Sequence, residues 1–368
     1  MKKGIKKIGK ILGYILLVVI IFISIILIVI RINSTGKPEP IVDSNGNLLP
    51  NSIAIIKDTV INGASQRLTI RGHDVSNPVL LRVHGGPGLP HAPQAYRFSG
   101  IDLEDKFTVC YWDQRGAGPA FKDEIPDSTI TIKQVVEDGI SVTEYLRKLL
   151  NKDKLYIEGM SFGTVIGSYM VAKKPEYYKS FIGVSQSVHM QRNELMTYDF
   201  ILKEARRKND TIAIRELEDI GRPPYKTYEE INRAVTTQRG YVRKYYPDKI
   251  KMNTSDIYKL MFLYDGWSMS YKWNIFNNGM WGKAAPLLWM DGQDHNLFEQ
   301  VPSWEIPVYI IQGEHDHFTE VSIAKQYFDS IQAPYKRFYL IEGATHQAFG
   351  ENPKKFREIM VNEVLEKD

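Results

Sequence analysis

The sequence predicts an α/β domain with a mostly parallel sheet, helices on both faces of that sheet, an inserted helical cap and an N-terminal transmembrane helix. Three observations predict this fold class. Short apolar runs alternate with helical stretches from residue 53 onward, an order typical of parallel sheets covered on both faces. The alternation stops over residues 187–304, and an uncharged apolar run fills residues 11–30.

The apolar run at residues 11–30 has the length and composition of a membrane-spanning helix. Its 20 uncharged residues extend about 30 Å as a helix, which matches the hydrocarbon thickness of a bilayer. Five lysines precede it, so the positive-inside rule places the N-terminus in the cytoplasm and the rest of the chain outside the cell. A cleaved signal peptide has a shorter apolar core and a small-residue cleavage site. We therefore favour an uncleaved anchor in the cell membrane.

Residues 32–52 are mostly polar and carry three prolines and two glycines, which predicts a tether. Beyond it, residues 131–150 have the apolar spacing of a helix, which Thr131 and Gln134 could begin with a capping box. Eight apolar runs are candidate strands. They are residues 53–58, 67–71, 78–84, 107–113, 154–158, 181–185, 307–312 and 336–341.

The segment 187–304 is too long for a loop between two strands. It is helix-like and rich in charged and aromatic residues, so we expect a cap over the C-terminal edge of the sheet, where sites of α/β proteins form. Its aromatic side chains should mostly form the core of the cap. They include Trp267, Trp273, Trp281, Trp289 and, at its end, Trp304.

These divisions predict four units along the chain. They are a cytoplasmic end with the anchor at residues 1–31, a linker at residues 32–52, a core made of residues 53–186 and 305–368, and the cap at residues 187–304.

Composition argues against several classes of function. The chain has a net charge of +4, but residues 1–31 hold six basic and no acidic residues, so the remainder is slightly acidic. Nothing in that balance points to nucleic acid as a partner. The single cysteine, Cys110, excludes an intrachain disulfide and a cysteine-based zinc site. Its apolar neighbours predict a place in the core.

Residues 159–163 read Gly-Met-Ser-Phe-Gly, between an apolar strand-like run and a helix-like stretch. This is the pattern of a nucleophile elbow, in which a sharp strand-to-helix turn exposes the serine hydroxyl. Gly159 and Gly163 would leave room beside Ser161, and the free N–H groups at the start of the helix suit a developing oxyanion. The pattern therefore predicts Ser161 as a nucleophile.

Two further motifs follow candidate strands. In an architecture with such an elbow, a glycine-rich loop like His84-Gly-Gly-Pro-Gly88 supplies a second oxyanion donor, whereas without the elbow it is an ordinary turn. Asp113-Gln-Arg-Gly116 follows the next strand, and an ion pair between Asp113 and Arg115 could brace the neighbouring loops.

A serine nucleophile needs a base and an acid that orients it, in the chain order Ser, acid, His. Ser161, Asp316 and His346 each follow a candidate strand in that order. Glu314 and Glu342 are rival acids, and we favour Asp316 because Glu314 lies closer to its strand. The histidines that flank Asp316 form only a weak ligand set, so we predict neither a metal ion nor a cofactor.

Five segments carry these motifs: His84-Gly-Gly-Pro-Gly88, Asp113-Gln-Arg-Gly116, Gly159-Met-Ser-Phe-Gly163, Gly313-Glu-His-Asp316 and His346. With them the chain resembles the α/β-hydrolase superfamily, and within it the proline iminopeptidase group of serine peptidases, over roughly residues 53–365. The resemblance implies an α/β-hydrolase fold with Ser161 as nucleophile, His346 as base and Asp316 as orienting acid. It also implies an oxyanion hole formed by the backbone N–H groups of Gly86 and Phe162.

The chain departs from that group at several points. The group usually has a further Gly where Leu89 stands and a Trp where Phe162 stands. The cap of the group carries glutamates that bind the free amine of the substrate, and the sequence pattern associated with them is absent here. Glu194, at the start of the predicted cap, is the best candidate for that role. The alternative for Glu194 is a solvated carboxylate on a helix face.

Together these inferences predict a membrane-anchored serine hydrolase that works through an acyl-enzyme. The favoured activity is an aminopeptidase of proline iminopeptidase type, which releases N-terminal residues from short peptides. An esterase or amidase acting on a small acyl compound is the alternative, and a non-catalytic binding protein of the same fold is a third. Epoxide hydrolases and dehalogenases need Asp where Ser161 stands. The expected partners are a small peptide or acyl substrate and, through residues 11–30, the membrane; the oligomeric state is left open.

Overall fold

An eight-stranded sheet forms the centre of the computed structural model, which describes residues 2–93, 103–247, 254–278 and 283–366. Its order is β1-β2-β4-β3-β5-β6-β7-β8, antiparallel from β1 through β2 to β4 and parallel at every other pair. All eight candidate strands are present. They are β1 (Ile53–Ile61), β2 (Ala64–Gly72), β3 (Val79–Val83), β4 (Thr108–Asp113), β5 (Leu155–Met160), β6 (Tyr178–Val184), β7 (Val308–Gly313) and β8 (Lys336–Ile341).

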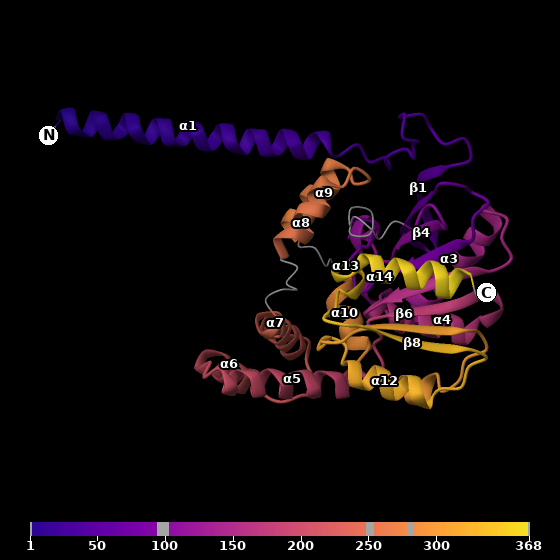
Figure 1. Ribbon diagram of the computed structural model, residues 1–368. Helices are drawn as coiled ribbons and strands as arrows, with labels where there is room; N and C mark the ends of the chain where they lie inside the picture. The colour runs from indigo at the N-terminus through magenta and orange to yellow at the C-terminus, as the bar shows by residue number, and fades with distance from the viewer. Residues whose placement is uncertain (1, 94–102, 248–253, 279–282, 367–368) are drawn as a thin grey trace.

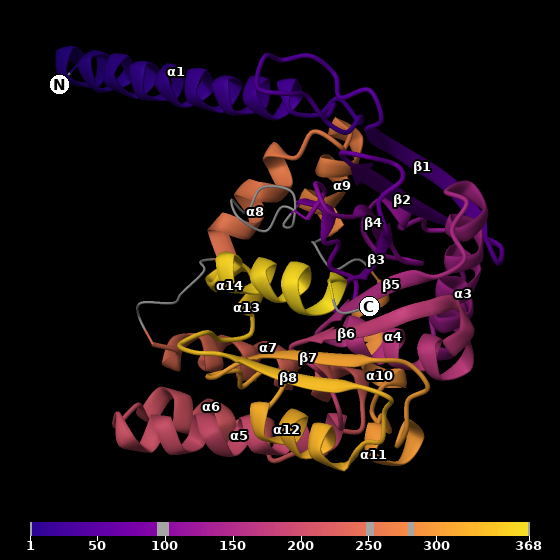
Figure 2. The same cartoon turned by 45° about the vertical axis from the view of Figure 1, so that its right-hand side comes forward.

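Helices cover both faces of this sheet (Figures 1 and 2). Alternate residues of β3 show the division, because Leu81 and Val83 join one hydrophobic core and Leu80 joins another. The first core holds α3 (Ile132–Leu149), α4 (Phe162–Lys173) and α12 (Val321–Ser330). The second holds α13 (Ala348–Glu351), α14 (Pro353–Glu358) and the terminal π-helix η5 (Ile359–Leu365). The predicted two-sided α/β arrangement is confirmed, and Cys110 is buried within the first core.

Helix α3 begins where the sequence predicts, but its cap differs from the expected one. The Thr131 hydroxyl accepts a hydrogen bond from the Gln134 N–H at 3.1 Å. The Gln134 side chain does not return the bond and instead donates to Asp138 Oδ1 at 3.0 Å. The Gln134 side chain is therefore directed at a buried carboxylate, and the reciprocal bond of a capping box is not formed.

The described residues between β6 and β7, in the segment for which a cap is predicted, form seven helices. They are α5 (Met190–Arg207), α6 (Thr211–Ile220), α7 (Tyr228–Tyr245), α8 (Thr254–Leu263), α9 (Met269–Asn278), α10 (Ala284–Asp291) and α11 (Leu297–Gln300). α5, α6 and α7 share a small core of their own, whereas side chains of α8 and α9 join the second core of the sheet. Figures 1 and 2 show α8 and α9 well apart from α5 and α6.

The tryptophans of this segment do not all form the core of a cap. Trp267 and Trp304 are buried, but in the two cores of the sheet rather than in a core of the cap, and Trp273 is 53% exposed. Trp289 is partly buried, and its ring lies 6.2 Å from that of Phe162. Trp281 lies outside the described residues. Trp289 is therefore the tryptophan that brings the cap to the residue after Ser161.

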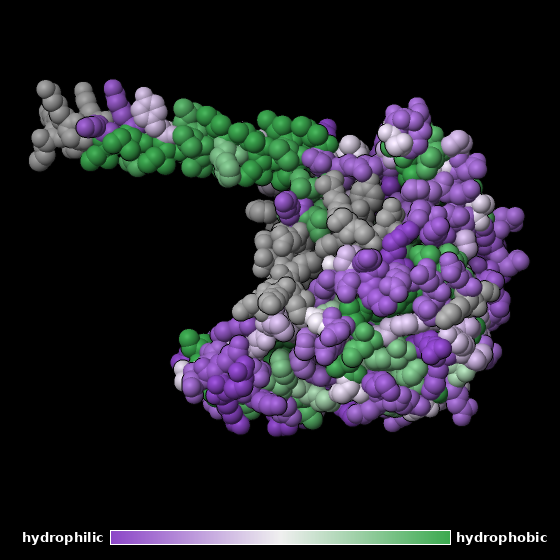
Figure 3. Space-filling model, viewed as in Figure 1, coloured by the Kyte–Doolittle hydropathy of each residue, from purple (hydrophilic) through white to green (hydrophobic). Residues whose placement is uncertain are grey.

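Helix α1 (Lys2–Ile32) carries the predicted membrane segment. Its stretch Lys7–Ile32 is long and apolar enough to cross a membrane, and no residue of its most apolar window is buried, so it stands out as an apolar rod in Figure 3. By length and composition alone, a signal sequence would pass the same test.

The segment after α1 is not the free tether that its composition suggests. The Gly36 N–H donates to the Asp265 carbonyl at 2.9 Å, and Thr35 forms a β-bridge with Ser268. The buried Lys272 ammonium donates to the Asn33 carbonyl. Polar composition indicated the lack of regular structure, but it could not show that these backbone groups pair with residues more than two hundred positions away.

Candidate active site

Ser161 lies at the sharp turn between β5 and α4. Its backbone has φ 52° and ψ −122°, a conformation that costs energy for a residue with a side chain and is typical of functional positions. A Cβ on Gly159 would lie 2.6 Å from the Gly163 carbonyl oxygen, and a Cβ on Gly163 would lie 2.1 Å from that of Val83. Both glycines are therefore required by close backbone packing, as the motif predicted.

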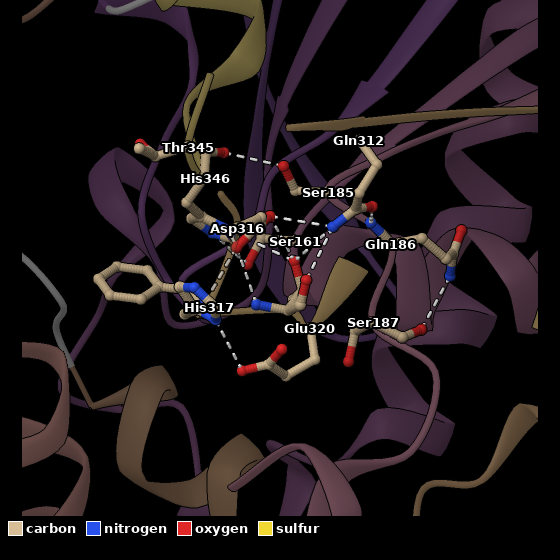
Figure 4. A network of polar contacts seen from close by, with 12 residues as sticks. Ser161, Ser185, Gln186, Ser187, Gln312, Asp316, His317, Glu320, Thr345 and His346 are labelled. Carbon is tan, nitrogen blue, oxygen red and sulfur yellow. Dashed lines mark hydrogen bonds and ion pairs between the residues drawn. The ribbon is translucent and has the colours of Figure 1, made fainter. Parts of the chain in front are cut away.

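The three residues expected to work together are in contact (Figure 4). Ser161 Oγ lies 3.0 Å from His346 Nε2. His346 Nδ1 lies 3.1 Å from Asp316 Oδ1 and 3.0 Å from Asp316 Oδ2. Loops after β5, β7 and β8 contribute one residue each, so the parallel sheet brings them to one edge. This arrangement allows the imidazole to take a proton from the serine hydroxyl.

Asp316 is held as a carboxylate by its surroundings. Oδ1 accepts hydrogen bonds from the N–H groups of Phe318 and Thr319, and Oδ2 accepts from the Thr319 hydroxyl and from Gln312 Nε2. Burial favours the neutral acid, but the charge and hydrogen bond of His346 and the bonds from Thr319 outweigh it, so the pKa of Asp316 lies below its usual value. An ionised Asp316 favours the tautomer of His346 that leaves Nε2 free to accept a proton.

The rival acids do not reach His346. Glu314 Oε2 accepts a hydrogen bond from the Gly343 N–H at 2.8 Å, and the Glu314 side chain is 41% exposed. Glu342 is exposed at the end of β8. Of the three acids that the sequence offered, only Asp316 has the position of an orienting group.

The glycine-rich loop after β3 lies against the elbow. A Cβ on Gly85 would come within 3.0 Å of Ser161 Cβ and 3.3 Å of the Phe162 nitrogen. Among the described backbone contacts, neither the Gly86 N–H nor the Phe162 N–H donates a hydrogen bond. An oxyanion hole needs backbone donors that are free to bind the substrate.

His84 opens this loop but does not act as a base for Ser161. Its side chain is buried, Nδ1 lies 3.0 Å from the Gly85 carbonyl oxygen, and Nε2 accepts a hydrogen bond from the Gln114 N–H. Burial lowers the pKa of His84 to about 4, which keeps the ring neutral at physiological pH. His84 therefore joins the loop after β3 to the loop after β4.

The expected ion pair between Asp113 and Arg115 is not formed. Arg115 instead pairs with Asp138 on α3, with Nε–Oδ2 at 2.7 Å and Nη2–Oδ1 at 3.0 Å. Asp113 is buried, and neither carboxylate oxygen has a hydrogen-bond partner in the described part of the chain. Burial raises the pKa of Asp113 to about 7, although the charge of Arg67 opposes the rise. The motif does brace neighbouring elements, but through a residue outside it.

Glu194 is buried in the cap rather than solvated on a helix face. Its Oε1 lies 2.5 Å from Arg239 Nη2 on α7. The Arg239 guanidinium lies over the rings of Trp289, at 5.6 Å, and Phe318, at 5.1 Å. Phe318 in turn lies 4.9 Å from the His346 ring. Phe318 thus lies next to both the Arg239 guanidinium and the His346 ring.

A small pocket opens beside Glu194. Proline, tyrosine and aliphatic side chains form most of its wall, and two glutamines add polar groups. The lining residues are Gln191, Glu194, Pro223, Pro224, Tyr225, Ile231, Val235, Trp289 and Gln293. Ser161 is not among them, so this pocket is a neighbour of the reactive centre, which Trp289 connects to it through Phe162.

Sequence reasoning missed four residues at this site: Arg239, Gln312, Phe318 and Thr319. Thr319 had a local signal, since a hydroxyl and an N–H three residues after an aspartate often bond back to its carboxylate. Arg239 had none, because nothing in the pattern of α7 shows which of its charged side chains turns towards α5. Such ion pairs between helices can be identified only once the relative positions of the helices are known.

A mostly parallel sheet covered on both faces, with serine at a strained strand-to-helix turn, defines a class of α/β proteins built to present a nucleophile. The chain belongs to the α/β-hydrolase fold family, whose model matches residues 78–353.

The chain is also similar to named proteins. It is 31% identical over 314 residues to the probable aminopeptidase YbaC of Bacillus subtilis (strain 168), covering 83% of this chain and 94% of that protein. The crystal structure of a proline iminopeptidase of Mycobacterium smegmatis superimposes with a TM-score of 0.59 at 17% identity, over 83% and 96% of the two chains. The structure of an epoxide hydrolase mutant of Vigna radiata superimposes with a TM-score of 0.54 at 18% identity, covering 85% of this chain and 99% of that one. At these identities the two structures show the fold alone.

Proposed function

We propose that this hydrolase is a serine aminopeptidase that removes the N-terminal residue from short peptides through an acyl-enzyme. The observation that carries the proposal is the continuous contact from Ser161 Oγ through His346 to Asp316 at the elbow. Serine at this turn does not suit the epoxide hydrolase mechanism, which needs a carboxylate nucleophile.

In the proposed reaction, Ser161 Oγ attacks the carbonyl carbon of the first peptide bond while His346 Nε2 takes the hydroxyl proton. The N–H groups of Gly86 and Phe162 stabilise the oxyanion of the tetrahedral intermediate. His346 then gives its proton to the leaving amine as the C–N bond breaks. Water, activated by His346, attacks the resulting ester, releases the amino acid and restores the Ser161 hydroxyl.

Glu194 is the proposed partner of the substrate's α-ammonium group. A buried carboxylate needs compensation, and Glu194 Oε2 has no hydrogen-bond partner in the described chain. The apolar wall of the neighbouring pocket suits the side chain of a small or proline-like N-terminal residue. The 31% identity to a probable aminopeptidase supports the same activity.

One observation favours a second candidate function, an esterase or amidase for small acyl compounds. Arg239 already neutralises part of the Glu194 charge at 2.5 Å, which weakens the attraction for an ammonium group. In that case the cap pocket would accept an uncharged acyl group.

We also propose that α1 is an uncleaved anchor with the N-terminus in the cytoplasm and the remaining chain outside the cell. Five lysines before the apolar stretch support this topology.

A substrate panel tests the proposed activity on the full chain in detergent. It contains aminoacyl-anilides, the same anilides with blocked amines, and short-chain esters, each with Ser161→Ala as control. Turnover of the free-amine anilides alone, lost in Ser161→Ala, is the expected result. Turnover of esters alone would assign the second function, and turnover that survives Ser161→Ala would reject Ser161 as nucleophile.

A further inference from the structure

Two arginines of α7 face one ring beside the reactive centre. Arg239 and Arg243 are four residues apart and therefore lie on the same side of the helix. Each guanidinium carbon lies 5.1 Å from the centre of the Phe318 ring, and that ring lies 4.9 Å from His346. A guanidinium over an aromatic face is held in place electrostatically, so both cations are positioned close to the site where the substrate reacts.

Only one carboxylate compensates these two cations. Glu194 pairs with Arg239, and no ion pair of Arg243 occurs among the described residues. Nearby carboxylates are engaged elsewhere, because Asp316 bonds His346 and Glu320 lies 3.1 Å from His317. Partial burial, followed by the positive charge of Arg239, lowers the pKa of Arg243. The face of the cap over Phe318 therefore carries an excess positive charge.

The contact between Glu194 and Arg239 also leaves hydrogen-bonding capacity on both partners. It joins one oxygen to one nitrogen, Oε1 to Nη2. The other atoms, Glu194 Oε2 and Arg239 Nη1, are both buried and have no partner within the described ranges. Buried polar atoms without partners are costly, so this pair is suited to a ligand that brings both a donor and an acceptor.

We propose that the cap binds the carboxylate of the leaving residue through Arg239 and Arg243, so that the preferred substrates are dipeptides with both ends free. This inference rests on the proposed aminopeptidase function. In a dipeptide the α-ammonium and the carboxylate flank a single peptide bond. The ammonium donates to Glu194 Oε2, and the carboxylate accepts from Arg239 Nη1 and from the unpaired Arg243. A longer peptide places its carboxylate beyond this face.

The test compares free-acid dipeptides with their C-terminal amides. The substrates are Pro-Ala and Leu-Ala, each as the free acid and as the amide, and release of the N-terminal amino acid by the full chain in detergent is measured. The two forms share the ammonium group and the scissile bond, so the ratio of their kcat/KM values reports recognition of the carboxylate alone. Because the ratio is taken within each variant, losses of folded protein cancel.

Three variants of α7 test whether Arg243 is responsible for the preference for free acids. Arg243→Met removes the unpaired charge and keeps an apolar chain over Phe318, whereas Arg243→Lys keeps the charge. Arg233→Met is the matched control, because Arg233 lies on the same helix with a 60% exposed side chain 3.7 Å from Asp219. Arg239 is left unchanged, since its removal would leave Glu194 buried without a counter-charge.

The wild type should prefer the free acids by about 10-fold or more, as expected for a charge-assisted contact. In Arg243→Met the ratio of kcat/KM for the free acid to that for the amide should fall close to one. Arg243→Lys and Arg233→Met should keep most of the preference for the free acid. Equal turnover of acids and amides by the wild type would overturn the carboxylate site and leave the aminopeptidase intact. Failure of the wild type to cleave any free-amine substrate would overturn both.

Discussion

The Asp316 carboxylate does more than contact His346. Donors from Gln312 and Thr319 and the N–H of Phe318 fix both oxygens, so the carboxylate cannot rotate away from the imidazole. Its pKa lies below the usual value, chiefly because His346 and Thr319 outweigh the effect of burial. Thr319 therefore contributes to both the charge and the orientation of this carboxylate, and a neutral replacement of similar size should remove the charge.

Asp316→Asn should lower kcat by roughly a thousand-fold or more with a small change in KM, because the imidazole loses both its favoured tautomer and its stabilising charge. Steady-state kinetics on the best substrate of the panel measure the effect. Glu314→Gln is the matched control on the same loop and should stay within a few-fold of wild type. Similar losses in both variants would show that the loop, rather than the Asp316 charge, matters.

The buried Asp113 predicts how stability depends on pH. Its pKa is raised to about 7 in the folded chain, above the value near 3.9 of an unfolded chain. Between these values the folded state holds a proton that the unfolded state has released, so the free energy of unfolding falls as pH rises from about 4 to 7. Asp113→Asn should therefore abolish a pH-dependent decrease of up to roughly 4 kcal/mol in the free energy of unfolding.

Urea unfolding at pH 5 and pH 8.5 measures that difference. The Asp113→Asn variant should gain stability over wild type at pH 8.5 and differ little at pH 5. Asp153→Asn, at an exposed position, should keep the wild-type pH dependence. An equal effect of Asp113→Asn at both pH values would mean that Asp113 is already ionised at pH 5.

At the scale of elements, the elbow depends on the close packing of β5, α4 and the end of β3. A Cβ on Gly163 would lie 2.1 Å from the Val83 carbonyl oxygen and 2.7 Å from that of His84. These are backbone atoms, which cannot move aside without shifting the glycine-rich loop. This close contact between α4 and the end of β3 thus helps to set the positions of Ser161 and of the expected oxyanion donors.

Gly163→Ala should therefore cost about 1–3 kcal/mol of stability or more and lower activity strongly in the fraction that folds. Gly240→Ala is the control, because Gly240 lies within α7 and a Cβ there would meet nothing within 4 Å; it should raise stability by up to about 1 kcal/mol. Chemical denaturation and activity per folded molecule are the two measurements. A Gly163→Ala enzyme of normal stability and rate would refute the packing argument.

The elements could be predicted from the sequence because apolar runs report burial directly. The eight strands and α3 follow from that pattern, and Ser161, Asp316 and His346 follow from their places after strands. The pairing of Arg115 with Asp138 and of Glu194 with Arg239 could not be predicted, since each joins charged residues on different elements. The division of the inserted helices could not be predicted either, because it depends on which hydrophobic core each helix packs against in the folded chain.

At the scale of the whole molecule, the apolar helix and the folded domain meet at defined contacts. Backbone bonds from Thr35 and Gly36 and the Lys272 ammonium join the end of α1 to the hairpin of α8 and α9. This hairpin also contributes Tyr264 and Trp267 to the core on one face of the sheet. An anchored chain would therefore hold its folded domain near the membrane surface.

If α1 is an uncleaved anchor, the full chain should remain in the membrane pellet after an alkaline carbonate wash, with the intact mass of all 368 residues. A Lys3→Cys variant should react with an impermeant thiol reagent only after the cells are opened, and wild type is the control because Cys110 is buried. A soluble product that lacks the apolar stretch would instead identify a cleaved signal.

Covalent labelling by a fluorophosphonate, followed by peptide mass spectrometry, tests most directly whether this molecule is a serine hydrolase. The adduct should be found on Ser161 in the wild type, disappear in Ser161→Ala, and form far more slowly in His346→Ala, because the imidazole activates the hydroxyl. No adduct on a folded wild-type chain, or labelling that persists in Ser161→Ala, would contradict the assignment of Ser161 as an activated nucleophile.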